Sequence, residues 1–159
     1  MKRSAGIMAY RWRDGAPELF LVHPGGPFWK NKDDGAWSIP KGEIDPDEDP
    51  LMAARREFRE ETGQAIDGAF IALDPVKIAS GKVIVAWAIE HDLDASGIRS
   101  NSFEIEWPPR SGKKQVFPEV DRAAWFPAVE ALRKINKGQA PLITQVLKTL
   151  GIPPPRPSS

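Results

Sequence analysis

Short apolar runs separated by turn-forming residues dominate the start of the chain. Residues 5–10 and 19–22 are two such runs, and the cluster Asp-Gly-Ala-Pro at 14–17 lies between them. This pattern predicts a β-hairpin. Residues 23–35 are rich in proline, glycine, asparagine and aspartate and predict a loop, and residues 37–39 are expected to form a brief strand.

The first helix is predicted to begin after Asp49. An aspartate can accept hydrogen bonds from the free amides of a first helical turn, and Pro50 suits the next position because no N–H is needed there. Gly63 is expected to end the helix. Three apolar residues recur at helical spacing and give it a core-facing stripe: Leu51, Ala54 and Phe58. Residues 41–49, before the helix, read as an acidic loop.

The rest of the chain alternates between strand and helix patterns. Strands are predicted at residues 69–73, 76–79, 83–90, 103–107 and 123–126. A basic loop is expected at 108–114, and helices at 129–135 and 142–150. The mixture indicates the α+β class. We expect residues 1–150 to form one domain and the proline-rich residues 151–159 to be a disordered tail.

Composition narrows the possibilities. A chain of 159 residues with 41% hydrophobic and 28% charged residues is typical of one soluble globular domain. Lys+Arg and Asp+Glu are balanced at 22 each, so no broad footprint for a long nucleic acid is expected. The absence of cysteine excludes disulfides, thiolate zinc sites and cysteine nucleophiles. The longest apolar run, 83–89, is too short to cross a membrane, so we expect a cytoplasmic protein.

Three glutamates on the predicted helix are the strongest chemical signal. Glu57, Glu60 and Glu61 stand at i, i+3 and i+4, which places their carboxylates on one face. Like charges at these spacings destabilise a helix by roughly 0.2–0.5 kcal/mol per pair. A divalent cation would offset that repulsion, and carboxylates favour Mg²⁺ or, as the alternative, Mn²⁺. Upstream, Gly42 allows a ligand to approach the backbone, and Lys41 is placed to meet a phosphate.

A simpler explanation competes with the metal site. Arg55, Arg56 and Arg59 are interleaved with the glutamates, and Arg56 and Glu60 have the spacing of an ordinary helical ion pair. On the acid cluster alone, a solvated salt-bridged face is the more common arrangement.

The spacing over residues 42–64 favours the metal site. Gly42, five residues, Glu48, seven residues and then Arg-Glu-Phe-Arg-Glu-Glu-Thr-Gly resembles the Nudix box, G-x5-E-x7-R-E-U-x-E-E-x-G-U, where U is apolar. Eight of the nine specified positions match, and the exception is Gln64 in the last apolar position. The mismatch falls on a position expected to pack rather than to hold metal.

The resemblance implies a fold and a set of roles. The fold would be a Nudix-type α/β/α sandwich with a mixed sheet, and the activity a Mg²⁺-dependent hydrolysis of a phosphoanhydride. Glu48, Arg56 and Gly63 would be structural residues of the motif. Four residues would supply metal ligands: Gly42 through its carbonyl, Glu57, Glu60 and Glu61. The general base in such enzymes is either a box glutamate or a glutamate from a later loop, and Glu119 is the candidate outside the box.

The flanking residues suggest a phosphate-rich substrate. The run Trp-Ser-Ile-Pro-Lys-Gly at 37–42 resembles the W-x-x-P-K-G variant found in Nudix enzymes that act on dinucleoside polyphosphates, diphosphoinositol polyphosphates and some nucleoside triphosphates. Lys41, Lys82 and Arg110 are the expected substrate-binding residues, with Lys113 and Lys114 nearby. A solvated surface turn explains the 110–114 cations equally well. The tyrosine and proline that mark two specialised Nudix classes do not occur at the expected positions.

Several alternatives stay open. Trp29 or Trp37 could stack on a base, although most tryptophans here fit a core, and His23 and His91 lack metal-ligand spacing. The chain could be a Nudix module that binds nucleotides as a sensor without catalysis, although all box carboxylates are intact. An RNA 5′ pyrophosphohydrolase is a further alternative, which the balanced charge disfavours. An isopentenyl diphosphate isomerase is disfavoured because that chemistry is associated with a cysteine. The main expectation is a small nucleotide or polyphosphate substrate, with no membrane partner.

Overall fold

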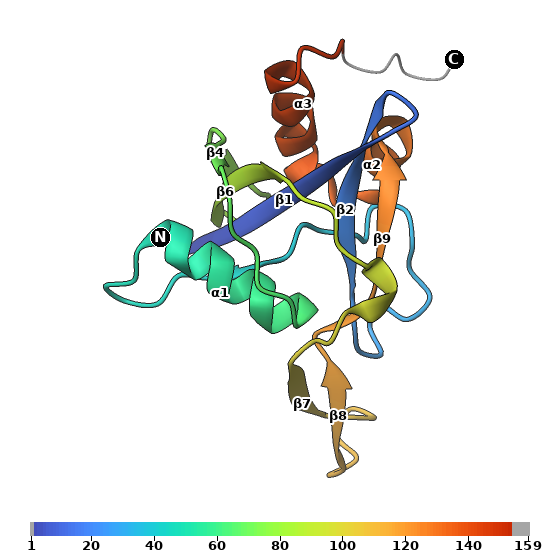
Figure 1. Ribbon diagram of the computed structural model, residues 1–159. Helices are drawn as coiled ribbons and strands as arrows, with labels where there is room; N and C mark the ends of the chain where they lie inside the picture. Colours follow the sequence, from blue (N-terminus) through green and yellow to red (C-terminus); the bar gives the residue numbers. More distant parts are fainter. Residues whose placement is uncertain (1, 154–159) are drawn as a thin grey trace.

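A seven-stranded mixed sheet forms the centre of the computed structural model, which describes residues 2–153 (Figure 1). Strand β1 (Arg3–Arg13) lies in the middle, parallel to β6 (Val83–Glu90) on one side and antiparallel to β2 (Ala16–Pro24) on the other. The remaining strands lie around these three: β3 (Lys41–Glu43) beside β1, β4 (Ile71–Ala72) and β5 (Val76–Lys77) beside β6, and β9 (Val120–Pro127) beside β2. The mixed sheet confirms the predicted α+β class.

Helices cover both faces of this sheet (Figure 1). Helix α1 (Pro50–Thr62) packs on one face, while α2 (Ala128–Lys134) and α3 (Ala140–Thr149) cover the other. Two short 3-10 helices complete the structure: η1 (Ala95–Gly97) and η2 (Lys137–Gln139). The architecture is the expected α/β/α sandwich.

Strand β1 is buried on both faces because successive side chains of a strand point to opposite sides. Ala5, Ile7 and Ala9 belong to the apolar cluster under α1. Met8 and Tyr10 belong to the second cluster, under α2 and α3. The predicted apolar run 5–10 is therefore a central strand without a solvent-facing side.

Both ends of α1 are capped as the sequence predicts. The Asp49 side chain accepts a hydrogen bond from Met52 N at 3.1 Å. Gly63 takes a left-handed conformation, with φ of 75°, and its N–H donates to Arg59 O at 2.8 Å. A distant segment also covers this end, because Asn101 N donates to Glu60 O at 2.8 Å. Long-range contacts thus fix the end of the helix that carries the glutamates.

The structure corrects the sequence expectations at several elements. Residues 41–43 are strand β3 and not loop, because they pair with the start of β1. Residues 37–39 form only single-residue bridges to Val22 and Ile135. The expected strand at 69–73 shrinks to β4. Each of these elements is set by a partner far away in the chain.

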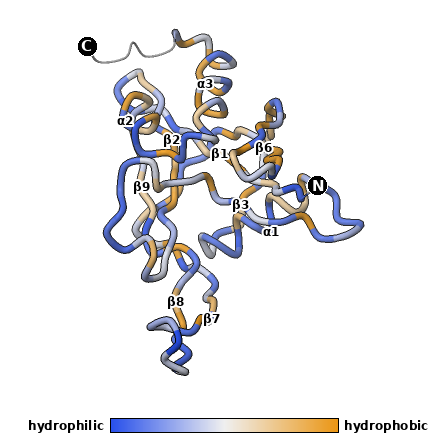
Figure 2. The backbone as a smooth tube through the Cα atoms, turned by 180° about the vertical axis from the view of Figure 1, so that it is seen from behind, coloured by the Kyte–Doolittle hydropathy of each residue, from blue (hydrophilic) through white to orange (hydrophobic). Residues whose placement is uncertain are grey.

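The largest departure is a two-stranded sheet that projects from the body (Figure 1). It consists of β7 (Ser102–Glu106) and β8 (Lys114–Pro118), antiparallel to each other. The loop expected at 108–114 is the turn that joins them, and β8 itself was not predicted. Its tip is hydrophilic, whereas apolar residues lie along both strands (Figure 2). We call β7, its turn and β8 the arm.

Two expectations about the chain as a whole remain predictions. The first concerns the tail predicted to be disordered, of which residues 154–159 lie outside the described part of the structure. The second is the assignment of residues 1–150 to one domain. Within residues 2–153, no helix combines the length and apolarity needed to cross a membrane.

Candidate functional site

Glu57 lies against the backbone of Gly42. A Cβ atom built on Gly42 would stand 2.0 Å from the carboxyl carbon of Glu57 and 2.2 and 2.4 Å from its two oxygens. The pairing of β3 with β1 and the packing of α1 on β1 bring these two positions together. Only a residue without a side chain leaves room for the Glu57 carboxylate here.

Arg56 holds the loop before α1 against the helix. Its Nε and Nη2 donate to the two carboxylate oxygens of Glu48, at 2.9 and 3.0 Å, and Nη2 also donates to Glu43 O at 3.1 Å. Its Nη1 donates to Glu57 and to Glu60, each at 3.0 Å. These hydrogen bonds raise the pKa of Arg56. The predicted pair of Glu48 and Arg56 is present, and the Arg56 guanidinium donates hydrogen bonds to three carboxylates.

Glu61 and Glu119 line one small cavity with Lys41. The cavity has a volume of about 140 Å³, and its walls consist of Val22, Pro24, Ser38, Lys41, Glu61, Glu119 and Val120. Glu61 accepts a hydrogen bond from Lys41 N at 3.3 Å. Pockets for drug-sized ligands usually have ~300–1,000 Å³, so this cavity suits a small charged group such as a phosphate rather than a whole nucleotide.

The carboxylates of this region repel one another. Burial raises the pKa of Glu61 to about 8, with Glu57 and Glu119 adding to the rise while Lys41 opposes it. Burial also raises the pKa of Glu57, and Arg56 opposes that shift. Desolvation, followed by the charge of Glu60, raises the pKa of Glu119. Negative charge is thus costly here, which is the condition under which a cation binds strongly.

Lys41 is the cation that lines the small cavity with Glu61 and Glu119. Desolvation and the positive charge of Lys82 lower its pKa, while Glu61 and Glu57 act in the opposite direction. The charge of Lys82 therefore acts on Lys41, while the substrate-binding role expected for Lys82 stays a prediction. Lys41 gives the cavity a positive charge that suits phosphate oxygens.

The glutamates do not converge on one point in this structure. Among residues 2–153, no three acidic or histidine side chains stand close enough to hold a metal ion as they are. Arg56 engages Glu57 and Glu60, while Glu61 is bonded to the Lys41 amide. The chemistry of the donor set still fits a hard divalent cation: several carboxylate oxygens lie beside an uncrowded glycine backbone.

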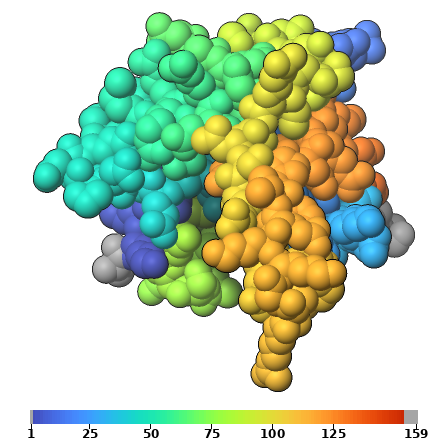
Figure 3. Space-filling view, turned by 90° about the horizontal axis from the view of Figure 1, so that it is seen from below, coloured from blue at the N-terminus to red at the C-terminus, as the bar shows by residue number. Residues whose placement is uncertain are grey.

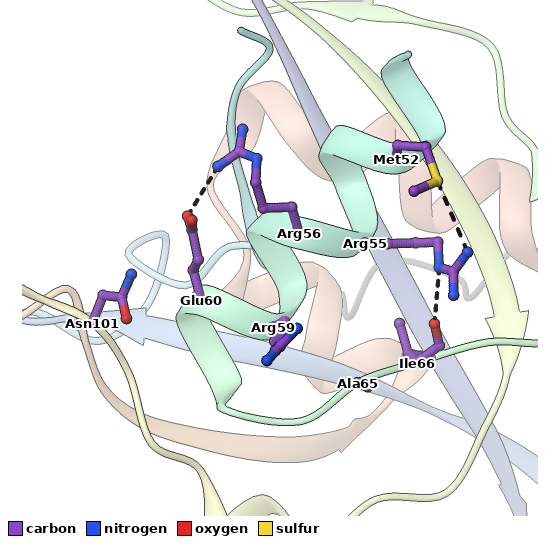
Figure 4. A pocket seen from close by; sticks show the side chains of 8 residues that line it. All are labelled: Met52, Arg55, Arg56, Arg59, Glu60, Ala65, Ile66 and Asn101. Atoms are coloured by element: carbon purple, nitrogen blue, oxygen red, sulfur yellow. Dashed lines mark hydrogen bonds and ion pairs between the residues drawn. The ribbon is translucent and has the colours of Figure 1, made fainter. Parts of the chain in front are cut away.

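A larger hollow lies on the outer side of α1 (Figure 4). It has a volume of about 440 Å³ and is lined by Met52, Arg55, Arg56, Arg59, Glu60, Ala65, Ile66 and Asn101. Arg55 donates to Ile66 O at 3.2 Å and Arg56 to Glu60, so two of its three guanidiniums already have protein acceptors. We therefore centre the candidate site on the smaller cavity, which combines Lys41, Glu61 and Glu119.

Some predicted residues lie away from the site. Arg110 is in the turn of the arm, and from there the chain runs along β8 before it reaches Glu119. Trp37 is buried, with only 4% of its surface exposed, so it cannot stack on a ligand. His23 is fully buried, with Nδ1 2.9 Å from Asp121 Oδ1 and Nε2 2.6 Å from Lys32 O. It links the loop after β2 to β9 and is a structural residue.

Sequence reasoning missed Gln139. Its buried side-chain oxygen accepts from Ile39 N at 3.1 Å, and its amide donates to Ser38 Oγ at 3.0 Å. These bonds anchor the Trp-Ser-Ile-Pro-Lys-Gly run from the opposite side of the sheet. A glutamine between two helical patterns carries no local signal of this role.

Comparisons with known proteins identify the family of this chain. The family model described as NUDIX domain matches residues 2–146, so the chain belongs to the NUDIX-domain family. The fold matches that of the NUDIX domain of Shewanella oneidensis NrtR complexed with ADP ribose, with a TM-score of 0.65, 20% identity, and coverage of 93% of this chain and 87% of that one.

Two further structures share the fold. The C. elegans Ap4A hydrolase binary complex has a TM-score of 0.64 and 21% identity over 95% of this chain and 98% of that one. The E. coli ORF135 protein has a TM-score of 0.52 and 25% identity over 100% and 96%. The similar structures thus include a protein described as a hydrolase and one complexed with ADP ribose, and the likeness itself concerns the fold.

Proposed function

We propose that this protein is a Mg²⁺-dependent pyrophosphohydrolase that cleaves a phosphoanhydride bond in a nucleoside diphosphate linked to a further group. A nucleoside triphosphate or a dinucleoside polyphosphate is the favoured substrate. The observation that carries the proposal is the cavity in which Lys41, Glu61 and Glu119 meet, next to the contact between Gly42 and Glu57.

The box glutamates are the proposed metal ligands. Glu57, Glu60 and Glu61, with the Gly42 carbonyl, would hold Mg²⁺, or Mn²⁺ as the alternative. Burial and, after it, the neighbouring carboxylates raise the pKa values of Glu57 and Glu61, which supports this assignment because a bound cation would stabilise their charged forms. When bound, the metal would supply charge stabilisation to the phosphate oxygens and activate water for attack.

The remaining side chains would bind the substrate and move a proton. Lys41 and Lys82 would bind phosphate oxygens as point charges. Glu119 is the proposed general base outside the box, because its carboxylate lines the cavity and desolvation raises its pKa. Arg56 and Glu48 would keep the loop before α1 in place, so that Gly42 stays beside Glu57.

One observation favours a second candidate function, a nucleotide sensor without catalysis. A structure with the same fold, the NUDIX domain of Shewanella oneidensis NrtR, is described as complexed with ADP ribose, so this fold can bind a nucleotide. The intact carboxylate set favours catalysis over this alternative.

The test is turnover of a substrate panel with millimolar Mg²⁺. The panel contains nucleoside triphosphates, diadenosine tetra- and pentaphosphate, ADP-ribose, diphosphoinositol phosphates and triphosphorylated RNA, with products resolved by ion-exchange chromatography. We expect Mg²⁺-dependent turnover of a nucleoside triphosphate or dinucleoside polyphosphate. The activity should be lost in Glu61→Gln and kept in Glu130→Gln, a matched change on α2. Preferred turnover of the RNA would replace the substrate class, and nucleotide binding without turnover would favour the sensor.

A further inference from the structure

The arm begins and ends at the candidate site. Asn101, just before β7, donates from its N–H to Glu60 O at 2.8 Å, and its own carbonyl accepts from Glu119 N at 2.8 Å. The segment that carries the arm is therefore bonded to α1 beside a box glutamate. Viewed from below, the arm crosses the molecule next to the α1 region and extends beyond the body (Figure 3).

The loop after β2 supports the arm from its other side. Gly25 N donates to Glu119 O at 2.9 Å. Gly26 has φ of 98°, and a Cβ atom built on it would stand 2.8 Å from the Phe103 ring on β7. The backbone of this loop thus touches the base of the arm directly, and the loop segment lies along the arm in Figure 3. Loop and arm form one wall beside the cavity.

Two aromatic rings meet on the outer part of this wall. Phe28 from the loop and Trp107 from the arm stand edge to face, with centroids 5.2 Å apart and an interplanar angle of 77°. Phe28 is 61% exposed, and neither ring belongs to the two apolar clusters of the body. Aromatic rings outside the core offer apolar area for a ligand, and a base can stack on such a ring.

The segments that carry this aromatic pair also carry cations. Four cations lie on the loop and at the turn of the arm: Lys30, Lys32, Arg110 and Lys113. Within residues 2–153, none of the four forms an ion pair with a carboxylate. The Lys32 ammonium instead lies over the Trp29 ring, 5.2 Å from its centroid. Within the described residues, the outer wall thus offers aromatic rings together with cations that form no ion pair, and the same segments also carry Asp33, Asp34, Glu104 and Glu106.

The length of the arm indicates how long a ligand must be to reach from the cavity to the Phe28–Trp107 pair. Trp107 N donates to Lys113 O at 2.9 Å, so the aromatic pair is level with Lys113. Glu119 is six positions after Lys113 along an extended chain, which corresponds to ~20 Å. A ligand that reaches from the cavity to Trp107 must be long, anionic in its middle and aromatic at its far end.

We propose that Phe28 and Trp107 form a subsite for the base of the second nucleotide of a dinucleoside polyphosphate. The four cations lie at the far end of this path, Arg110 and Lys113 in the turn that follows Trp107 and Lys30 and Lys32 just after Phe28, where they would meet the outer phosphates. The inference rests on the proposed function, of which it selects one substrate class. It also assigns a role to Arg110, which lies away from the cavity.

The test compares a long substrate with a short one. For diadenosine tetraphosphate, Trp107→Ala and Phe28→Ala should each raise KM about tenfold or more, since stacking of one base on an aromatic side chain has that order of effect. The same variants should leave kcat and KM for ATP unchanged. Trp12→Ala is the matched control, because Trp12 is 44% exposed and lies at the end of β1 that is farther from β3 and the candidate site. An unchanged KM for diadenosine tetraphosphate in both variants overturns the subsite.

A binding experiment separates failure of the subsite from failure of the proposed function. If wild-type protein hydrolyses nothing, the proposed function fails, and calorimetric titration with diadenosine tetraphosphate then tests the subsite alone. Weaker binding in Phe28→Ala and in Trp107→Ala, with melting temperatures near that of wild type, supports it. Equal binding overturns it. If sedimentation shows a wild-type dimer that Trp107→Ala converts to a monomer, the aromatic pair is an interface between two copies, and the subsite is again overturned.

Discussion

Substitution of Gly42 by alanine tests the geometry of the site most directly. The new methyl group would stand 2.0 Å from the carboxyl carbon of Glu57, whereas non-bonded carbon atoms prefer ~3.5–4.0 Å. The carboxylate must therefore move by ~1.5 Å, out of reach of Arg56 or away from its neighbouring glutamates. Gly42 does not have a positive φ, so the backbone itself tolerates alanine. The expected damage is confined to the site.

The magnitude follows from that displacement. A misplacement of about 1 Å in a catalytic group can cost ~100-fold in rate, so we expect Gly42→Ala to lower kcat/KM by ~100-fold. The melting temperature without metal should change little, while the stabilisation by added Mg²⁺ should largely disappear. Gly97→Ala is the control, since its nearest atom would be an ordinary 3.5 Å contact. Turnover and a Mg²⁺-induced shift in melting temperature equal to those of wild type would refute the assigned geometry.

Three further substitutions test the site and the core. Burial raises the pKa of Glu61 from 4.5 to about 8 in the folded protein. The metal-free protein should therefore lose up to about 4 kcal/mol of unfolding free energy as the pH rises from 5 to 9. Urea titrations at several pH values should show a smaller dependence of the unfolding free energy on pH in Glu61→Gln. Arg56→Lys removes the paired bonds to Glu48 and should cost about 1–3 kcal/mol in the same assay. Phe58→Ala, at a fully buried position beside Phe20, should cost about 3–5 kcal/mol by chemical denaturation.

Local spacing predicted the part of the site that one helix carries. Glu57, Glu60 and Glu61 share a face because of the helical repeat, and the caps at Asp49 and Gly63 follow from the chemistry of helix ends. None of these inferences needs information about a distant segment. The same holds for the hairpin of β1 and β2, whose turn residues are adjacent in sequence.

The arm could not be predicted in this way. Residues 114–118 contain two polar residues in a row and no clear alternation, and their strand exists because β7 pairs with it. The meeting of Phe28 with Trp107, and of Glu119 with Glu61, joins segments far apart in the chain. Hydrophobic periodicity reports which face of an element is buried, but not which distant residue lies opposite it.

The contacts of Arg56 show how the predicted salt-bridged face and the predicted metal site coexist. Its Nε and Nη2 are bonded to Glu48, whereas only Nη1 reaches Glu57 and Glu60. Those two glutamates can therefore leave Nη1 for a cation while the paired bonds to Glu48 still hold the loop that carries Gly42. In the absence of metal, the same guanidinium neutralises part of their charge. The acidic cluster can therefore be a salt-bridged face without metal and a metal site with it, while Arg56 stays bonded to Glu48 in both states.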